Sequence, residues 1–321
     1  MPTFLEDCGR RALLRRSAAL SVGAALMAAP MAARAAQDDQ GTPAAAGGLG
    51  DPADRQGDFV EVDGARIFYQ QSGQGEPMFL IHGYPLSGAL FDRNREALAE
   101  QYQVTTIDQR GYGLSETSEA ASTIATHADD ALAVLDELGI DQAIVGGHSM
   151  GGPITLEMYQ RAPDRFRGMI LIDTIAAQAS AIEAGLWQGF VTYVQANGID
   201  QMYVSNLLKE MLTGQTRLDQ PELVAFLTEI VNAASVDAAI GGAQALATRP
   251  DFTQLLEQIE VPTLVFVGIE DSIYPFEISQ MMQEAIPNAT LAMIPNAAHA
   301  AVFEAPRRSN QAILDWAGGI G

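Results

Sequence analysis

The sequence is short of cations and almost free of cysteine, and both shortages exclude classes of function. Only 18 Lys and Arg stand against 40 Asp and Glu, a formal net charge of −22 over 321 residues, and Lys209 is the single lysine. Binding to nucleic acid or to an anionic membrane surface needs clustered cations, so neither is expected as a partner. One cysteine, Cys8, cannot form an internal disulfide, and four scattered histidines give no zinc-binding pattern. Apolar residues make up 48% of the chain, which is enough for a folded domain of catalytic size.

The few cations are concentrated at the start of the chain. Residues 1–36 contain five arginines, while 13 of the 18 cations and 38 of the 40 anions follow them, so the remainder carries −25. The small or apolar residues 17–29 are too few for a membrane span of about 20 residues but suit the centre of a signal peptide. Arg10 and Arg11 resemble a twin-arginine signal, with general secretion and a cytoplasmic amphipathic helix as the alternatives. We therefore expect an exported protein, periplasmic or secreted, without a stable membrane anchor.

After this leader, a structureless stretch precedes a regular alternation of patterns. Residues 37–57 are rich in Gly, Pro, Ala and Asp without apolar periodicity, which predicts a flexible linker. The segments Phe59–Val62 and Arg66–Gln70 read as two strands joined by Asp63-Gly64, a pair typical of tight hairpin turns. Six later apolar runs predict strands that are buried on both faces: Met78–Ile81, Val104–Ile107, Ala143–Gly146, Met169–Ile172, Leu264–Gly268 and Leu291–Ile294. With helical patterns between them, these runs predict an α/β fold with a mostly parallel sheet covered by helices on both faces.

One long stretch interrupts the alternation. About ninety residues between Ile172 and Leu264 contain helical patterns and no convincing strand: Trp187–Val194, Met202–Met211, Pro221–Val231 and, less clearly, Ala238–Ala247. We therefore divide the rest of the chain into a core, 58–175 and 251–321, and a helical lid, 176–250. Inserted after the sixth strand, the lid is expected to cover the carboxyl ends of the strands, where α/β proteins bind ligands.

The residues 147–151, Gly-His-Ser-Met-Gly, carry the clearest chemical pattern. They lie between a predicted strand and a predicted helix, and Gly147 and Gly151 give the clearance that a sharp strand-to-helix turn needs. Such a turn exposes the Ser149 hydroxyl at the start of a helix, where backbone N–H groups stabilise negative charge. Ser149 is therefore the predicted nucleophile.

A serine hydroxyl becomes a good nucleophile only when a base takes its proton, and only four histidines are available. His148 adjoins Ser149, but neighbouring side chains at a sharp turn point apart. His127 begins a predicted helix, and His82 ends the third strand, where it is expected to order a loop. His299 lies in a loop after the last strand and is the predicted base.

The base in turn needs a carboxylate that fixes its orientation. Asp271 follows the strand Leu264–Gly268 in a short acidic loop and lies between nucleophile and histidine in chain order. It is the predicted acid. Its neighbour Glu270 is expected to point to solvent, and Asp173, which follows the sixth strand at the same sheet edge, stays open as an alternative.

These residues together resemble the α/β-hydrolase fold family over about 59–316, nearly all of the chain after the leader. The order Ser149, Asp271, His299 is the order found in that family. The resemblance implies an α/β-hydrolase fold with a mostly parallel central sheet, helices on both faces and a helical lid.

Two loops add to the resemblance. The sequence His-Gly-Tyr-Pro at 82–85 is similar to the family's oxyanion loop, which implies that the backbone N–H groups of Tyr84 and Met150 hold the oxyanion. The D-x-R-G-x-G-x-S segment that begins at Asp108 is structural in the family, and we expect a buried ion pair between Asp108 and Arg110.

The elbow sequence also resembles one branch of the family. Gly-His-Ser-Met-Gly-Gly is similar to carboxylesterases, enol-lactonases and cofactor-free haloperoxidases or perhydrolases, whereas an aspartate at Ser149 would mark epoxide hydrolases and haloalkane dehalogenases. The resemblance implies a serine hydrolase that cleaves small-molecule esters or lactones without metal or organic cofactor. A perhydrolase, a carbon–carbon bond hydrolase, which commonly has Asn where His148 stands, and an inactive binding module are the alternatives.

Aromatic side chains in the lid are the candidates for the substrate pocket. Trp187, Phe190 and Tyr203 are the predicted pocket residues, although at helical spacing such residues also serve for packing. Three further lid residues are weaker candidates: Tyr193, Met202 and Phe226.

Overall fold

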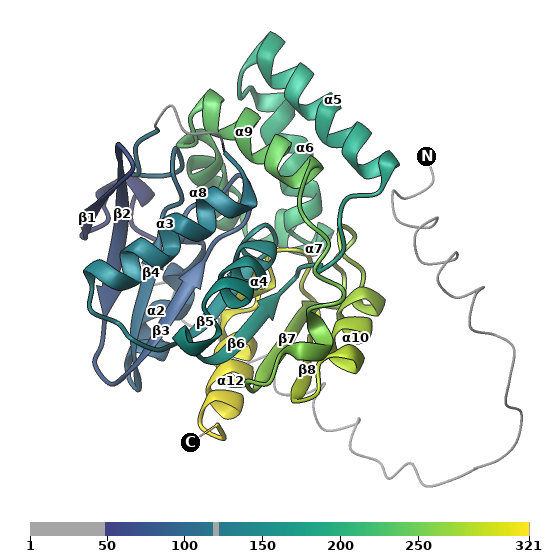
Figure 1. Ribbon diagram of the computed structural model, residues 1–321. Helices are drawn as coiled ribbons and strands as arrows, with labels where there is room; N and C mark the ends of the chain where they lie inside the picture. Colours follow the sequence, from purple (N-terminus) through teal and green to yellow (C-terminus); the bar gives the residue numbers. More distant parts are fainter. Residues whose placement is uncertain (1–48, 118–121, 321) are drawn as a thin grey trace, which may run out of the picture.

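The apolar runs form one eight-stranded sheet in the computed structural model, which describes residues 49–117 and 122–320 (Figure 1). The predicted signal peptide, 1–36, lies outside the described residues. The strand order is β1-β2-β4-β3-β5-β6-β7-β8. The strands are β1 (Asp58–Val62), β2 (Ala65–Ser72), β3 (Glu76–Ile81), β4 (Tyr102–Ile107), β5 (Ala143–His148), β6 (Phe166–Ile172), β7 (Thr263–Gly268) and β8 (Ala289–Ile294).

The hairpin at the start of the sheet follows from its turn residues. Asp63 and Gly64 have φ values of 45° and 76°, the left-handed conformations that a tight two-residue turn requires. β1 pairs with β2, and β2 with β4, in antiparallel orientation, while the pairs from β3 to β8 are parallel. The predicted mostly parallel sheet is thus confirmed, and the carboxyl ends of six strands meet at one edge.

Helices cover both faces of this sheet. Because side chains alternate along a strand, Phe79 and Ile81 pack into one apolar cluster while Met78 and Leu80 pack into the other. One cluster includes residues of α3 (Ile124–Glu137), α4 (Gly151–Arg161) and α10 (Phe276–Ala285). The other includes residues of α2 (Asp92–Ala99), α11 (Ala301–Glu304) and α12 (Pro306–Ala317). Four short 3-10 turns lie between these elements in the described residues: η2 (Pro52–Asp54), η3 (Gly88–Phe91), η4 (Pro163–Arg165) and η5 (Leu256–Gln258).

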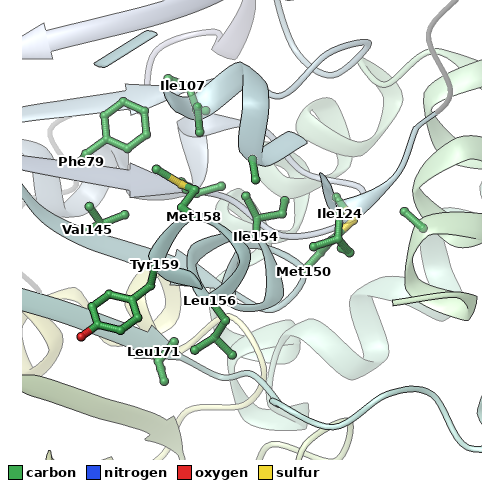
Figure 2. Close-up of a cluster of buried hydrophobic side chains, with 14 of the residues drawn as sticks. Phe79, Ile107, Ile124, Val145, Met150, Ile154, Leu156, Met158, Tyr159 and Leu171 are labelled. Atoms are coloured by element: carbon green, nitrogen blue, oxygen red, sulfur yellow. The ribbon is translucent and has the colours of Figure 1, made fainter. Parts of the chain in front are cut away.

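The helix that follows the serine turn is fixed by its apolar side. Figure 2 shows Ile154 and Met158 of α4 on the side of the helix that faces Phe79 and Val145 of the sheet. All four side chains are fully buried, and burial of one such side chain stabilises a fold by about 1.5–3 kcal/mol. Met150, the residue before the helix, belongs to the same cluster, so the start of α4 has little freedom to move.

The lid consists of five helices that follow β6 and precede β7. They are α5 (Ala181–Asn197), α6 (Gln201–Met211), α7 (Gly214–Asp219), α8 (Pro221–Asn232) and α9 (Val236–Ala247). In Figure 1 this teal-to-green group lies beyond one end of the sheet, with α5 outermost. Within the described residues no single helix is long and apolar enough to cross a membrane; α8 and α9 pass only as a pair, bent by 93°.

Side-chain caps explain where the lid helices begin. The helices other than α8 follow a residue whose side chain accepts a backbone N–H of the first turn: Ser180, Asp200, Thr213 and Ser235. α8 begins at Pro221, a residue favoured in the first helical turn. The sequence patterns predict four of these helices but not α7, because six residues are too few to show a helical period.

The described end of the predicted linker differs from the expectation. Residues 52–54 form a 3-10 turn, Pro52 is buried, and the Arg55 side chain is 5% exposed. Its guanidinium binds both carboxylate oxygens of Asp108, with Nη1 2.9 Å from Oδ1. The prediction of an Asp108–Arg110 pair is wrong, because Arg110 binds Asp130 of α3 instead, with Nε 2.7 Å from Oδ2.

We predict that Arg55→Met destabilises the fold by about 3 kcal/mol, because it leaves the fully buried carboxylate of Asp108 without its counter-charge. Arg66→Met is the matched control, since Arg66 forms exposed ion pairs that contribute at most about 1 kcal/mol. Urea unfolding of both variants measures the difference. Equal losses in the two variants would contradict a structural role for residues 52–55.

Candidate active site

The serine turn has the strained geometry that the glycine spacing predicts. Ser149 follows β5 with φ of 52°, a left-handed conformation that is unfavourable for a residue with a side chain. Its N–H donates to Ile172 O at 2.9 Å, and its carbonyl accepts from Thr174 Oγ1 at 2.6 Å. A Cβ at Gly147 would clash with the Gly151 carbonyl, so this glycine is needed for the close approach of strand and helix.

Three polar side chains from separate loops form a continuous hydrogen-bonded chain. His299 Nε2 lies 2.8 Å from Ser149 Oγ, and His299 Nδ1 lies 2.9 Å from Asp271 Oδ2. A carboxylate accepts, so Nδ1 carries the proton and Nε2 is left to accept the serine proton. The other oxygen of Asp271 accepts the N–H groups of Ile273 and Tyr274 at 2.8 and 3.0 Å, which fixes the carboxylate toward the histidine.

The structure separates the candidate acids. Asp173 is fully buried, and its oxygens accept Gly268 N at 2.7 Å and Ala301 N at 3.2 Å, so it braces two loops and does not bond His299. Burial and the nearby Asp271 raise the pKa of Asp173 well above its usual value. Glu270 is exposed. Asp271 is therefore the carboxylate that the fold brings to the histidine.

Two of the remaining histidines are structural. His82 accepts Gln109 N at 2.9 Å and donates to Gly83 O at 2.8 Å, which orders the loop after β3 as expected. His127 lies 2.9 Å from Ser122 Oγ. Burial lowers the pKa of His82 to about 4 and that of His127 to about 3, so both are neutral in the folded protein at pH 7.

These buried histidines make stability depend on pH. In the unfolded chain a histidine titrates near pH 6.5, above the pKa of about 3 that His127 has in the folded protein. Between these two values the unfolded state binds more protons than the folded state, so stability falls as the pH drops from about 6.5 to about 3. We predict that the loss of unfolding free energy between pH 7 and pH 5 is smaller by about 2 kcal/mol in His127→Gln than in the wild type. Urea unfolding at both pH values tests this, and equal losses would contradict it.

His148 has a role that sequence analysis missed. Its Nε2–H donates to the carbonyl of His299 at 2.7 Å, while the serine hydroxyl bonds His299 Nε2. Burial lowers the pKa of His148 well below its usual value, so the ring is neutral. The residue beside Ser149 thus holds the backbone of His299.

The predicted oxyanion donors lie where the loop after β3 meets the serine turn. A Cβ on Gly83 would come within 2.7 Å of Ser149 Cβ, so the loop packs directly against the turn. Among the described residues no acceptor bonds the backbone N–H of Tyr84 or Met150. An oxyanion donor needs such an unoccupied N–H group, so the two predicted donors stay a prediction.

The lid contributes aromatic rings to this loop. The Tyr84 ring centroid lies 5.5 Å from that of Trp187, which lies 5.5 Å from that of Phe190. Tyr203 donates to the Tyr84 hydroxyl at 2.6 Å, since Tyr84 donates its own proton to Ala239 O at 3.0 Å. The three predicted pocket residues therefore gather beside Tyr84, but Tyr203 is 2% exposed and serves as a link between lid and loop.

The weaker pocket candidates lie elsewhere. Met202 is 55% exposed, the Tyr193 hydroxyl donates to Asp200, and Phe226 stacks on Phe303 at 5.5 Å. The structure also places Tyr274, which is 3% exposed, next to His299, with the two ring centroids 5.6 Å apart. Its position three residues after the predicted acid is the only signal that could have indicated it.

Comparison with known proteins identifies the fold family. The profile of the alpha/beta hydrolase fold matches residues 76–306, well over half of the chain. The chain belongs to the α/β-hydrolase fold family. The prediction of this family from the elbow and the loop motifs is confirmed, as is the helical insertion after β6.

Among solved structures, this α/β hydrolase is similar to a thermophilic esterase from Thermogutta terrifontis, with 29% identity, a TM-score of 0.78 and coverage of 83% of this chain and 98% of that one. It is also similar to a bromoperoxidase from Bacillus anthracis, with 25% identity, a TM-score of 0.72 and coverage of 79% and 96%. Among curated proteins, the 3-oxoadipate enol-lactonase 2 of Acinetobacter baylyi is 28% identical over 264 residues, 80% of this chain and 94% of that protein.

Proposed function

We propose that this α/β hydrolase cleaves carboxylic esters or lactones of small molecules through an acyl-enzyme on Ser149. The observation that carries the proposal is the chain of hydrogen bonds from Asp271 through His299 to Ser149 Oγ, at 2.9 and 2.8 Å. The esterase and enol-lactonase among its relatives support the same bond class.

The geometry gives each group one task in acyl transfer. His299 Nε2 takes the Ser149 proton as Oγ attacks the carbonyl carbon, and Asp271 stabilises the imidazolium that forms. The tetrahedral oxyanion is held by the N–H groups of Tyr84 and Met150, donors of a kind whose removal typically raises the barrier by about 3 kcal/mol. The protonated His299 then donates its proton to the leaving alcohol oxygen. Water hydrolyses the acyl-enzyme by the same steps, with His299 again as base.

A second reaction uses the same groups. Similarity to the bromoperoxidase favours perhydrolysis, in which hydrogen peroxide replaces water and releases a peracid that oxidises halide. The carbon–carbon hydrolase alternative is less favoured because His148 stands where that branch commonly has Asn. A complete, hydrogen-bonded triad also argues against an inactive binding module.

A substrate panel tests the proposal. We expect the purified protein to hydrolyse p-nitrophenyl esters of graded acyl length, or lactones of graded ring substituent, with Ser149→Ala as the inactive control. Bromide oxidation with hydrogen peroxide and acetate runs in parallel. Hydrolysis that is lost in Ser149→Ala supports the esterase or lactonase proposal. Peroxide-dependent bromination without ester cleavage would replace that proposal by the perhydrolase. Absence of any Ser149-dependent turnover would overturn the proposed function.

We also propose that the protein is exported through the twin-arginine route. The five arginines of residues 1–36 and the small-residue stretch after them support this proposal. Cell fractionation should place the full chain in the periplasm and leave the variant Arg10→Lys, Arg11→Lys in the cytoplasm. Cytoplasmic wild-type protein would overturn the proposal.

A further inference from the structure

The loop that carries His299 is held by several hydrogen bonds to its backbone. Glu270 N donates to Ala297 O at 2.9 Å, and His148 donates to the His299 carbonyl. Two further connections join this loop to the lid, one directly to Met211 and one through the side chain of Glu304. The proposed mechanism does not use them.

The first bond joins backbone to backbone. Ala300 N, directly after the base, donates to Met211 O at 2.9 Å. Met211 is the last residue of α6, so the end of a lid helix and the base loop are directly bonded.

The second bond runs through a buried carboxylate. Glu304 Oε2 accepts Ala298 N, directly before the base, at 2.7 Å. Its other oxygen, Oε1, accepts both Thr213 N at 2.8 Å and Thr213 Oγ1 at 2.7 Å. Glu304 and Thr213 are each only 6% exposed, and Thr213 is the cap of lid helix α7. One carboxylate thus ties the junction of α6 and α7 to the base loop.

We propose that Glu304 and Thr213 are positioning residues for His299, so that the lid is a structural part of the catalytic centre. Hydrogen bonds to a buried carboxylate are short and strong. Glu304, held by Thr213, binds the loop at Ala298, and Met211 binds it at Ala300. His299 Nε2 must stay within hydrogen-bond reach of Ser149 Oγ. A shift of the junction would therefore move the base relative to the nucleophile.

The lid also holds the opposite side of the site. Tyr203 of α6 bonds the hydroxyl of Tyr84, whose N–H is a proposed oxyanion donor. A Cβ at Gly242 of α9 would come within 2.7 Å of the Tyr84 ring, so this part of the lid packs tightly on the same side chain. One helical insertion therefore braces the loops of both the base and the oxyanion donor.

This inference rests on the proposed function, and its test separates the two. Thr213→Val keeps the shape and the backbone N–H but removes the hydroxyl that donates to Glu304 and also caps α7, and we expect kcat to fall about tenfold with KM changed less than twofold. Glu304→Gln should lower kcat about 100-fold, as expected for a misplaced base. Thr213→Ser restores the hydroxyl and should recover wild-type kcat.

The matched control is Thr228→Val, a lid threonine whose hydroxyl, within the described part of the chain, bonds the carbonyl of Val224 in its own helix and no other group. It should leave kcat unchanged. The rate of reaction with a fluorophosphonate probe, which needs the base but no ester pocket, should fall in parallel with kcat in Thr213→Val and Glu304→Gln.

The outcomes are distinct. Variants that lose thermal stability yet react with the probe at the wild-type rate would overturn the positioning role alone. Failure of Thr213→Ser to recover kcat would also overturn it. A wild-type protein that neither reacts with the probe nor hydrolyses esters would overturn the proposed function and this inference together.

Discussion

Replacement of Ser149 by alanine is expected to lower kcat about 10⁶-fold for any ester that the protein cleaves. The reason is that alanine removes the only atom placed 2.8 Å from His299 Nε2 that can form the acyl-enzyme. Thermal unfolding should change little, because Ser149 is linked to its neighbours mainly through its backbone. Initial rates with the best ester of the panel measure the effect.

Ser272→Ala is the control for this substitution. Ser272 is an exposed serine beside the predicted acid, and its hydroxyl bonds only Glu210. Its replacement should leave kcat within twofold of the wild type. Residual activity of more than about 1% in Ser149→Ala would show that another group attacks the substrate.

Replacement of Asp271 by asparagine is expected to lower kcat about 10⁴-fold. Asparagine is nearly the same size, but it carries no charge to stabilise the imidazolium, and its amide favours the wrong histidine tautomer. KM should change much less than kcat, because Asp271 is 4% exposed and bonds His299 and backbone N–H groups.

Glu270→Gln provides the matched comparison one residue away. Its side chain is exposed, so the same chemical change should leave kcat within twofold of the wild type. Asp271→Asn that keeps more than about a tenth of wild-type kcat, together with an inactive Asp173→Asn, would transfer the role of acid to Asp173.

The sheet and its order of elements could be predicted because their signals are local. The turn at Asp63-Gly64 needs left-handed backbone conformations, and short apolar runs such as Met169–Ile172 mark strands buried on both faces. The expectation of burial on both faces is wrong for the edge strand β8, which is only partly buried. The proposed nucleophile has an equally local signal in the glycines around Ser149. The proposed base could be chosen because the chain has only four histidines and, of these, His299 alone lies in a loop after the last strand.

The contacts between distant side chains could not be predicted in this way. Asp108 has Arg110 two residues away, yet its partner is Arg55, because Arg110 is directed toward Asp130 of α3. Nothing in the local sequence distinguishes these arginines. The prediction of a flexible linker is wrong at the end of that segment for the same reason. Its polar composition indicates no fixed structure, yet Arg55 binds Asp108, 53 positions later in the chain.

The bracing of the base loop was missed on similar grounds. Glu304 lies in a four-residue helix, and its partner Thr213 is 91 positions earlier in the lid. A glutamate in an acidic chain is expected on the surface, whereas this one is 6% exposed and bonded through both oxygens. Its burial depends on the way the lid folds back over the sheet edge, which no sequence pattern describes.

The account depends most on Ser149 being the nucleophile, and covalent labelling tests this most directly. The purified protein is incubated with a fluorophosphonate, digested, and the modified peptide is sequenced by tandem mass spectrometry. We predict one phosphonyl group per chain, attached to Ser149 Oγ, and no label in His299→Ala. A label on another residue, or no label on the wild-type protein, would contradict the account.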